Sequence, residues 1–475
     1  MEQFLKRIID NLKTKRVDYG DVRFVEQEVE IIVLKNGVIE AISHISDSGF
    51  GVRVLKDSAW GFSSSNIIKK SEADRVTNDA LKIARASATV KSKTFFLSPL
   101  KPQKGTYTTM LKENPMDVAL DKKLDLLMAC DRIMAEDKRI KVRTGFMRFK
   151  RVKTHFASTE GALIKQKMVF SGGSLKVFAM EDGEMQSRSY GNYNQAGYEF
   201  IQKLKFLENA ARIREEVLML LKAKPCPDVK TTLILDAEQM VLQTHESCGH
   251  PTELDRVLGT EASYAGTSFL TTDKLNKFKY GSEVVNIVAD ATTPGGLGTF
   301  GWDDEGVPGQ KVYLVKNGIF VGYLSSRETA PIVNSRSSGA MRADGWNRIP
   351  LIRMTNINLV PGTWSFEDMI ADTDSGIFMT TNKSWSIDDK RLNFQFGCEL
   401  ARKIENGKLT EVYKNPLYAD ITPRFWNSCD AFGDKKSWQL FGVPNCGKGE
   451  PGQTAFVGHG TVPARFRDVQ VGIKK

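Results

Sequence analysis

The chain has 475 residues, of which 41% are apolar and 26% are charged, and its formal net charge is +10. This length is too great for one simple core, so two domains, or one domain with large insertions, are expected. No run approaches the ~18 uninterrupted apolar residues that a membrane span needs. The six cysteines are scattered without paired spacing, which argues against a disulfide framework. We therefore expect a cytoplasmic protein without a membrane partner.

The first half of the chain predicts helices alternating with strands. Residues 1–16, MEQFLKRIIDNLKTKR, carry apolar side chains at helical spacing, which is typical of an amphipathic helix and not of a signal peptide. Residues 22–65 alternate as strands do, and Asn36-Gly37 predicts a hairpin because a type I′ turn needs two residues tolerant of positive φ. Further helices are expected at 71–87 (capped by Ser71), at about 117–136 and at about 198–222.

A basic run covers residues 138–153, KRIKVRTGFMRFKRVK. Basic and apolar residues nearly alternate in it, which predicts a half-exposed strand with one basic face. The alternative is a nucleic-acid site that would bind in a salt-dependent way. No nucleic-acid motif accompanies the run, so we expect no nucleic-acid partner.

The segment 224–228, KPCPD, ends the last of these helices with two prolines that flank one residue. It is the best candidate for a domain boundary. We predict an α+β protein with an N-terminal α/β domain of antiparallel strands and helices, residues 1–224. A β-rich C-terminal catalytic domain, residues 225–475, follows and carries the helix described next. Two more hairpin turns are expected there, at Asn317-Gly318 and Asn406-Gly407.

The most informative motif is HESCGH, residues 245–250. In the familiar zinc-protease motif H-E-x-x-H the histidines are four apart and share a helix face. Here they are five apart, which on an ideal helix places them about 140° apart around the axis instead of about 40°. A π-bulge would restore one common face. Alternatively the helix ends near Gly249, because Pro251 biases His250 away from the α region.

A zinc site at this motif needs a third ligand. Cys446, in the Gly-rich stretch NCGKG near the C-terminus, is the leading candidate. Cys248, between the histidines, and His459, close to Cys446 in the sequence, are its rivals. Without a third ligand, His245 and His250 are as well explained as ordinary polar residues.

The chain resembles the TldD/PmbA family in several blocks: HESCGHPTELD, GVPNCGKGEPGQ, GLGTFGWDDEG, RMTNINLVPG and SDSGFGVRVLKDSAWGFSSSN. The likeness covers nearly the whole chain and is to the metal-bearing TldD side. It implies a zinc (Zn2+) metallopeptidase of unfolded or short peptides. It implies His245, His250 and Cys446 as ligands, with Glu246 catalytic. It also implies a homodimer, or a heterodimer with a metal-less PmbA/TldE-like paralogue.

In a His₂Cys site the fourth zinc position stays open for water, and Glu246 is placed to accept the proton of that water. Arg353, Thr355 and Asn356 are candidate substrate-binding donors, and an extended peptide could add as a strand to a C-terminal sheet. The acidic residues 303–305 are expected to form a solvated turn, in preference to an anchor for a peptide amine. The competing hypothesis is a non-catalytic, metal-stabilised subunit of a peptidase heterodimer with a closed four-ligand site. The intact Glu246 argues against it.

Overall fold

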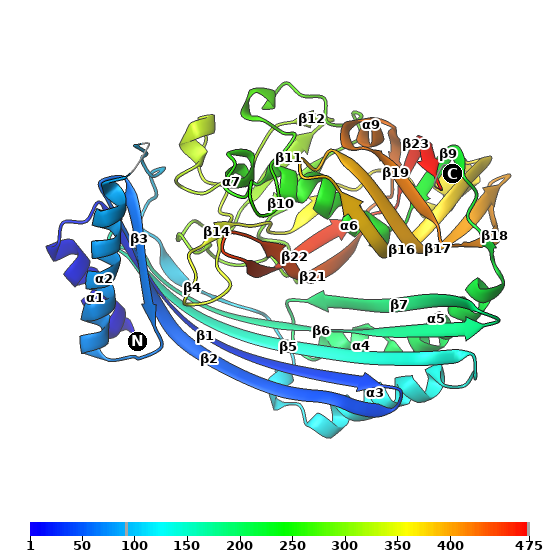
Figure 1. The fold of residues 1–475 in the computed structure, drawn as a ribbon, viewed down its shortest axis with the longest axis horizontal. Helices are drawn as coiled ribbons and strands as arrows, with labels where there is room; N and C mark the ends of the chain where they lie inside the picture. The colour runs from blue at the N-terminus through cyan, green and yellow to red at the C-terminus, as the bar shows by residue number, and fades with distance from the viewer. Residues whose placement is uncertain (91–93, 473–475) are drawn as a thin grey trace.

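The computed structural model describes residues 1–90 and 94–472, so the last three residues of the predicted second domain lie outside the described part. A long, curved sheet forms one layer, and a β-rich layer lies against its concave face (Figure 1). The predicted α+β class is confirmed. The strands of the curved sheet run in the order β3-β2-β1-β5-β6-β4, with β7 also paired to β6. They are β1 (Tyr19–Lys35), β2 (Val38–Lys56), β3 (Ala59–Ser65), β4 (Lys104–Thr108), β5 (Ile140–Ser158), β6 (Leu163–Glu181) and β7 (Glu184–Asn194).

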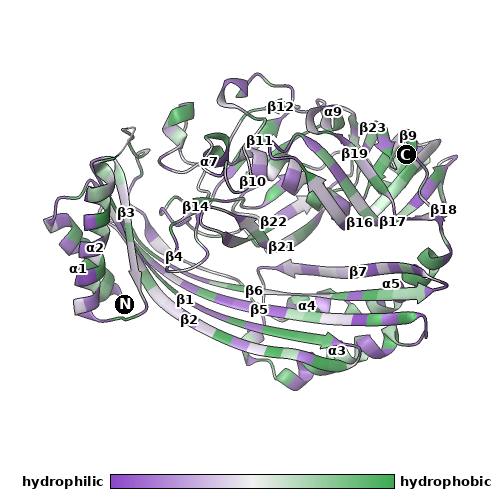
Figure 2. Ribbon diagram, in the orientation of Figure 1, coloured by the Kyte–Doolittle hydropathy of each residue, from purple (hydrophilic) through white to green (hydrophobic). Residues whose placement is uncertain are grey.

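Strand alternation gives the curved sheet two different faces. Even-numbered residues of β1 join two apolar clusters on the convex face, Val22 and Phe24 at one end and Ile32 and Leu34 at the other. Odd-numbered residues of β1, such as Gln27, face the other layer. The convex face is covered by five helices: α1 (Glu2–Thr14), α2 (Lys70–Ala88), α3 (Leu120–Met134), α4 (Glu199–Lys203) and α5 (Phe206–Lys222). Figure 2 shows apolar and polar residues alternating along the strands of the curved sheet.

Most of the local predictions for this half are confirmed. The hairpin turn has φ of 49° at Asn36 and 75° at Gly37, and the basic run lies in β5. The cap at Ser71 is wrong, because α2 begins one residue earlier at Lys70 and no side chain caps it. The single helix expected at 198–222 is two helices, since Lys205 between them is left-handed, with φ of 47°.

The second layer uses only residues after 223, and the curved sheet uses none after 194. The predicted boundary at 224–228 stays a prediction. An eight-stranded sheet runs in the order β16-β9-β23-β19-β17-β18-β8, with β20 also paired to β23, and β8 joins it through β18. Its strands are β8 (Lys224–Pro225), β9 (Val229–Leu235), β16 (Ser375–Ile387), β17 (Asn393–Glu405), β18 (Lys408–Lys414), β19 (Leu417–Ile421), β20 (Cys429–Phe432) and β23 (Ala464–Val471).

Smaller elements complete this layer around one large apolar core. The predicted turns are present, with positive φ at Asn317-Gly318 and Asn406-Gly407. Among the described helices, none is long and apolar enough to cross a membrane. The smaller strands are β10 (Ile287–Asp290), β11 (Lys311–Lys316), β12 (Ile319–Phe320), β13 (Met341–Arg342), β14 (Leu351–Ile352), β15 (Ile357–Leu359), β21 (Gln439–Lys448) and β22 (Gln453–Thr461), and the helices are α6 (Ala237–Thr244), α7 (Leu254–Val257), α8 (Phe366–Ala371) and α9 (Thr422–Asn427).

Candidate metal centre

The helix that carries HESCGH changes its winding within the motif. Helix α6 is capped by Asp236, whose carboxylate accepts a hydrogen bond from the Gln239 N–H at 2.7 Å. It continues into a π-helical turn, His245–Gly249, followed by a 3-10 turn, His250–Thr252. The π turn absorbs the surplus residue of the five-residue spacing. Of the two irregularities weighed from the sequence, the π turn is therefore present. The expectation that Pro251 moves His250 out of the α region is wrong, because His250 keeps right-handed helical angles, with φ of −60° and ψ of −43°.

Three potential metal ligands meet at the end of this helix. The Cys446 Sγ lies 3.4 Å from His245 Nε2 and 3.6 Å from His250 Nε2. One ligand atom from each residue lies within 4.8 Å of the others, and all three residues are buried. A tetrahedral zinc ion with bonds of ~2.0–2.3 Å spaces its donors by roughly 3.3–3.8 Å. The donor set and its spacing fit such an ion.

His459 orients the His245 ring through the nitrogen that faces away from Cys446. Its Nε2 lies 2.9 Å from His245 Nδ1, and its own Nδ1 lies 3.2 Å from the Ile357 carbonyl oxygen. Burial, with His245 close by, holds the pKa of His459 well below its ordinary value. A neutral His459 that donates from Nδ1 to the carbonyl must accept from His245 Nδ1–H. The lone pair of His245 Nε2 then faces Cys446.

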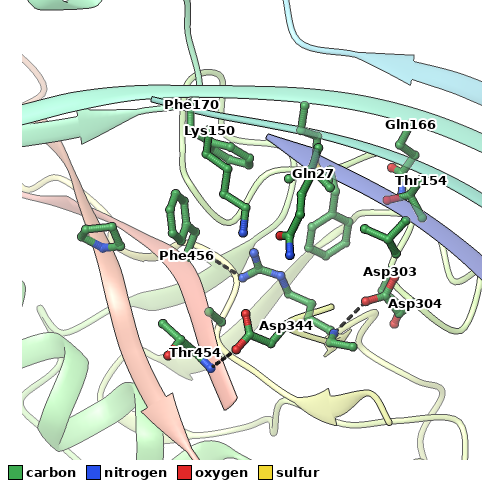
Figure 3. Close-up of a pocket in the computed structure, with 18 of the residues that line it drawn as sticks. Gln27, Lys150, Thr154, Gln166, Phe170, Asp303, Asp304, Asp344, Thr454 and Phe456 are labelled. Atoms are coloured by element: carbon green, nitrogen blue, oxygen red, sulfur yellow. Dashed lines mark hydrogen bonds between the residues drawn. The ribbon is translucent and has the colours of Figure 1, made fainter. Parts of the chain in front are cut away.

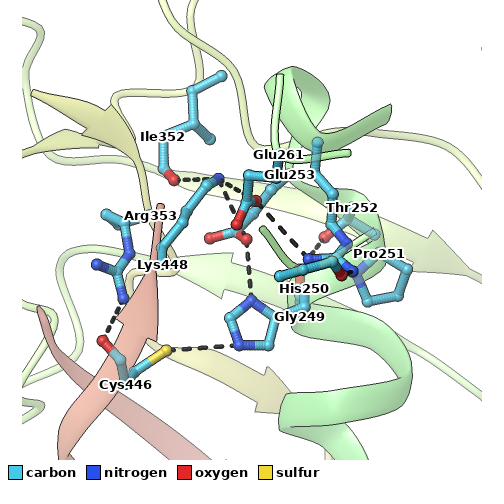
Figure 4. A network of polar contacts seen from close by, with 12 residues as sticks. Gly249, His250, Pro251, Thr252, Glu253, Glu261, Ile352, Arg353, Cys446 and Lys448 are labelled. Carbon is cyan, nitrogen blue, oxygen red and sulfur yellow. Dashed lines mark hydrogen bonds and ion pairs between the residues drawn. The ribbon is translucent and has the colours of Figure 1, made fainter. Parts of the chain in front are cut away.

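A buried carboxylate orients His250 in the same way (Figure 4). The Glu253 Oε2 lies 2.9 Å from His250 Nδ1 and 3.2 Å from the Lys448 ammonium, which also contacts Asp255 at 2.7 Å and Glu261 at 3.4 Å. Burial raises the pKa of Glu253, but Lys448 and His250 outweigh it and hold that pKa well below the ordinary value. An ionised Glu253 fixes the ring so that Nε2 faces the thiol.

Cys446 lies on β21, far from the histidines in the sequence. Burial raises the pKa of its thiol, but His245 and His250 outweigh this and hold the pKa well below the ordinary value. Positive charge at Nε2 of either ring, whether a proton or a bound metal ion, therefore favours the thiolate. Arg353 fixes this strand, donating to the Cys446 carbonyl oxygen and, at 3.2 Å, to that of Gln453 on β22.

The two rival ligands take other positions. Cys248 lies in the apolar core, where burial raises its pKa to about 12. His459 contacts His245 from the side away from Cys446. Within the described part of the chain, the group with metal-ligand spacing contains His245, His250 and Cys446 only. A closed four-ligand protein site therefore has no support among these residues.

The three ligand candidates form part of the wall of a cavity of about 520 Å³, which Glu246 also lines. Glu246 Oε2 lies 2.5 Å from an Arg391 guanidinium nitrogen. Burial raises the pKa of Glu246, but His250, His245 and Arg391 outweigh it and lower the pKa. The sequence did not indicate Arg391: it lies in the turn between β16 and β17, and no local pattern marks it.

The predicted substrate donors lie deeper in the protein. Arg353, Thr355 and Asn356 are all buried. Asn356 donates to the Asp290 carbonyl oxygen and accepts from the Gly298 N–H. None of the three lines the cavity beside Glu246. That they bind substrate stays a prediction.

The acidic turn at 303–305 is not solvated, contrary to expectation. Asp303 is 4% exposed and Glu305 is 2% exposed. Asp303 accepts hydrogen bonds from three backbone N–H groups, and Glu305 pairs with Arg53 at 3.3 Å. Glu305 thus holds the loop against the curved sheet, and Asp303 fixes the backbone of the loop.

A buried His₂Cys group beside a carboxylate in a cavity defines a candidate metalloenzyme. Family models of the PmbA/TldA metallopeptidase match three segments: domain 1 at 20–84, the central domain at 113–221 and the C-terminal domain at 228–472. A metalloprotease of Methanocaldococcus jannaschii is 36% identical over 447 residues, covering 93% of this chain and 94% of that protein. The chain belongs to the TldD/PmbA family.

Other relatives and solved structures agree. A protein of Saccharolobus solfataricus named a zinc metalloprotease TldD homolog is 22% identical, covering 91% of each chain. The crystal structure of TldE from Thermococcus kodakarensis superposes with a TM-score of 0.76 at 17% identity, covering 99% of this chain and 100% of that one. A putative modulator of DNA gyrase from Thermotoga maritima gives 0.80 at 18% identity, with 99% and 100% covered. These two likenesses show the fold.

Proposed function

We propose that the chain is a zinc-dependent peptidase that hydrolyses unfolded or short peptides. His245, His250 and Cys446 are its metal ligands, and Glu246 is its general base. The observation that carries this proposal is the meeting of all four side chains at one cavity wall. The names of the relatives, metalloprotease and zinc metalloprotease TldD homolog, support it.

Zinc held by these residues would supply a Lewis acid that acidifies a water molecule and polarises the scissile carbonyl. Glu246 accepts a proton from the water as its oxygen bonds to the carbonyl carbon. It then delivers that proton to the amide nitrogen as the C–N bond breaks. Arg391 is a positioning residue, because its guanidinium holds the Glu246 carboxylate in the cavity.

The size of the cavity supports the substrate class. A volume of about 520 Å³ is in the range of small-ligand sites and admits a few residues of extended chain. Apolar side chains of Leu242, Trp385, Phe441 and Val443 share its lining with polar groups. A folded domain is far larger than this space, so we propose short or unfolded peptides.

Glu246→Gln tests this proposal. The variant keeps the three ligands but has no carboxylate to accept a proton, so we expect full zinc content and hydrolysis slowed by about 100-fold or more. Metal analysis and an assay on mixed unfolded peptides measure both. Glu215→Gln, on an exposed side chain of α5, is the matched control. Full activity in Glu246→Gln would remove the assigned role, and a zinc-loaded wild-type chain without activity would favour the non-catalytic subunit.

We further propose a dimer, formed with a second copy or with a metal-less relative, in the cytoplasm. Strand β2 pairs with β3 only over Phe50–Lys56, so among the described strands its outer edge at 38–49 has no partner. Apolar side chains are exposed along it, with Val38 at 66% and Ile45 at 54%. Such an edge favours pairing with another chain. Light scattering of the chain alone and with such a relative tests this, and monomers in both samples would contradict it.

A further inference from the structure

A second cavity, of about 470 Å³, lies between the concave face of the curved sheet and the β-rich layer (Figure 3). Strands β1, β5 and β6 form one wall. The other wall comes from the loops around Asp304 and Asp344 and from the β21–β22 hairpin. We call it the basic cavity, because Arg23, Arg148, Lys150 and Arg342 line it.

Two of these cations, Lys150 and Arg148, make no hydrogen bond or ion pair with a carboxylate among the described residues, although the charge of Asp344 attracts both of them from beyond ion-pair distance. The Lys150 ammonium makes no hydrogen bond or ion pair there, and it lies 5.1 Å from the centroid of the Phe456 ring. Arg148 contacts the same ring at 5.0 Å, and its Nε is buried without a partner. The two residues are two apart on β5 and so share one face. Figure 3 shows Lys150 and Gln27 pointing into the space.

Arg342 adds a third cation, for which the described part of the chain has no carboxylate at ion-pair distance. Its guanidinium donates to two backbone carbonyl oxygens, of Met354 at 3.1 Å and of Phe456 at 2.5 Å. Burial lowers the pKa of Lys150 to about 8 and that of Arg342 to about 10. Bringing an anion into the cavity would offset this cost of holding buried cations.

The carboxylates in the cavity wall already have other partners. Asp344 accepts from the Thr454 N–H at 2.9 Å. Asp304 accepts from the Ala343 N–H at 2.7 Å and pairs with Arg23 at 3.4 Å. Asp303 accepts three backbone N–H groups. The cavity therefore offers cationic donors with unused capacity to a ligand from outside.

This cavity and the one beside Glu246 meet at the β21–β22 hairpin. Asn445 lines both of them, and the next residue is Cys446. The shared residue places the basic cavity next to the cavity beside Glu246.

We propose that the basic cavity binds a carboxylate of the peptide substrate through Lys150, Arg148 and Arg342. This inference rests on the proposed peptidase function. The carboxylate can be the C-terminus of the peptide or an Asp or Glu side chain, since both offer the same acceptor oxygens to the cations.

The test compares three peptides of one unfolded sequence, each labelled at the N-terminus. One has a free C-terminus and no acidic residue, the second is its C-terminal amide, and the third is the amide with one neutral residue replaced by glutamate. Their affinities are measured by fluorescence anisotropy with zinc-loaded Glu246→Gln protein. We expect the second peptide to bind about tenfold or more weakly than the first peptide, the third peptide or both, because it lacks the charged acceptor that the cations would bind.

Adding Lys150→Met should remove that difference and leave the amide's affinity unchanged. Lys141→Met is the matched control, since Lys141 is exposed on the same strand, and it should keep the difference. Equal binding of all three peptides to the Lys150-containing protein would overturn the proposal without any further variant. If binding depends on the carboxylate but the wild type hydrolyses no peptide, the proposed peptidase function is refuted. The carboxylate-binding role of the basic cavity is then still supported.

Discussion

Both histidine rings present Nε2 to Cys446 because each Nδ1 has a partner of its own, His459 for His245 and Glu253 for His250. Such contacts fix the tautomer and the ring orientation before a metal arrives, and their loss typically costs 10–100-fold in metal affinity. The thiol of Cys446 supplies the third donor from a different part of the chain.

Cys446→Ser tests the third donor. A serine hydroxyl is a poor ligand for zinc compared with a thiolate, so we expect the purified variant to lose stoichiometric zinc. Metal analysis measures this directly. Cys248→Ser, which changes a thiol outside the ligand group, should keep its zinc. Zinc retained at full stoichiometry in Cys446→Ser would transfer the ligand role to another residue.

How much of the site the sequence predicts depends on the distance along the chain between the contacting residues. The motif HESCGH indicated a metal site, and its spacing indicated an irregular helix, because both are local properties. The Gly-rich stretch around Cys446 was found as a candidate only because few other ligand types were available. Arg391 and Lys448 reach Glu246 and Glu253 across 145 and 195 positions of sequence, and no spacing rule links residues so far apart.

At the scale of elements, the π-helical turn depends on close packing against a neighbouring loop. A Cβ added at Gly249 would lie 2.2 Å from the Met354 sulfur. Glycine is therefore required there by space, since its backbone φ of −57° suits any residue. Turns at Asn36, Asn317 and Asn406 were predictable because the turn type selects the residue type. The break at Lys205 was not, because lysine carries no such signal.

Gly249→Ala should destabilise the protein by ~1–3 kcal/mol, as overpacking of a filled core does. The urea midpoint of unfolding and the zinc content measure the effect. Met354→Ala in the same chain should relieve part of it, so the double variant is more stable than the sum of the single effects predicts. Gly447→Ala is the steric control, because a Cβ there meets no atom within 4 Å. Strictly additive effects would contradict the packing argument.

At the scale of the whole molecule, buried ion pairs join the curved sheet to the β-rich layer. Arg53 of β2 contacts Asp21 at 2.7 Å and Glu305 of the second layer at 3.3 Å, and Glu305 also accepts from the Arg327 N–H at 2.8 Å. Arg188 of β7 likewise pairs with Glu399 of β17 at 2.9 Å. The sequence placed 303–305 in solvent because an acidic turn is usually exposed, and only the packing of the two layers buries it.

Glu305→Ala should destabilise the protein by ~1–3 kcal/mol, because Arg53 keeps Asp21 but loses its second buried carboxylate, and the Arg327 N–H loses its acceptor. Equilibrium unfolding in urea measures this. Glu283→Ala removes an exposed carboxylate of the same layer and should change the free energy of unfolding by less than about 0.5 kcal/mol. Similar stability of the two variants would show that the pair contributes little to holding the layers together.

Strand β21 contributes to three sites. It carries the metal-ligand candidate Cys446, and its residue Asn445 lines both the cavity beside Glu246 and the basic cavity. By thermodynamic linkage, the effect of binding at one site on the affinity of another site is reciprocal. If a bound peptide fixes Asn445 and so tightens zinc binding by some factor, zinc must tighten peptide binding by the same factor. Peptide and metal would then each raise the affinity of the protein for the other. A protein without zinc would therefore bind substrate more weakly and would also lack the metal that its chemistry needs.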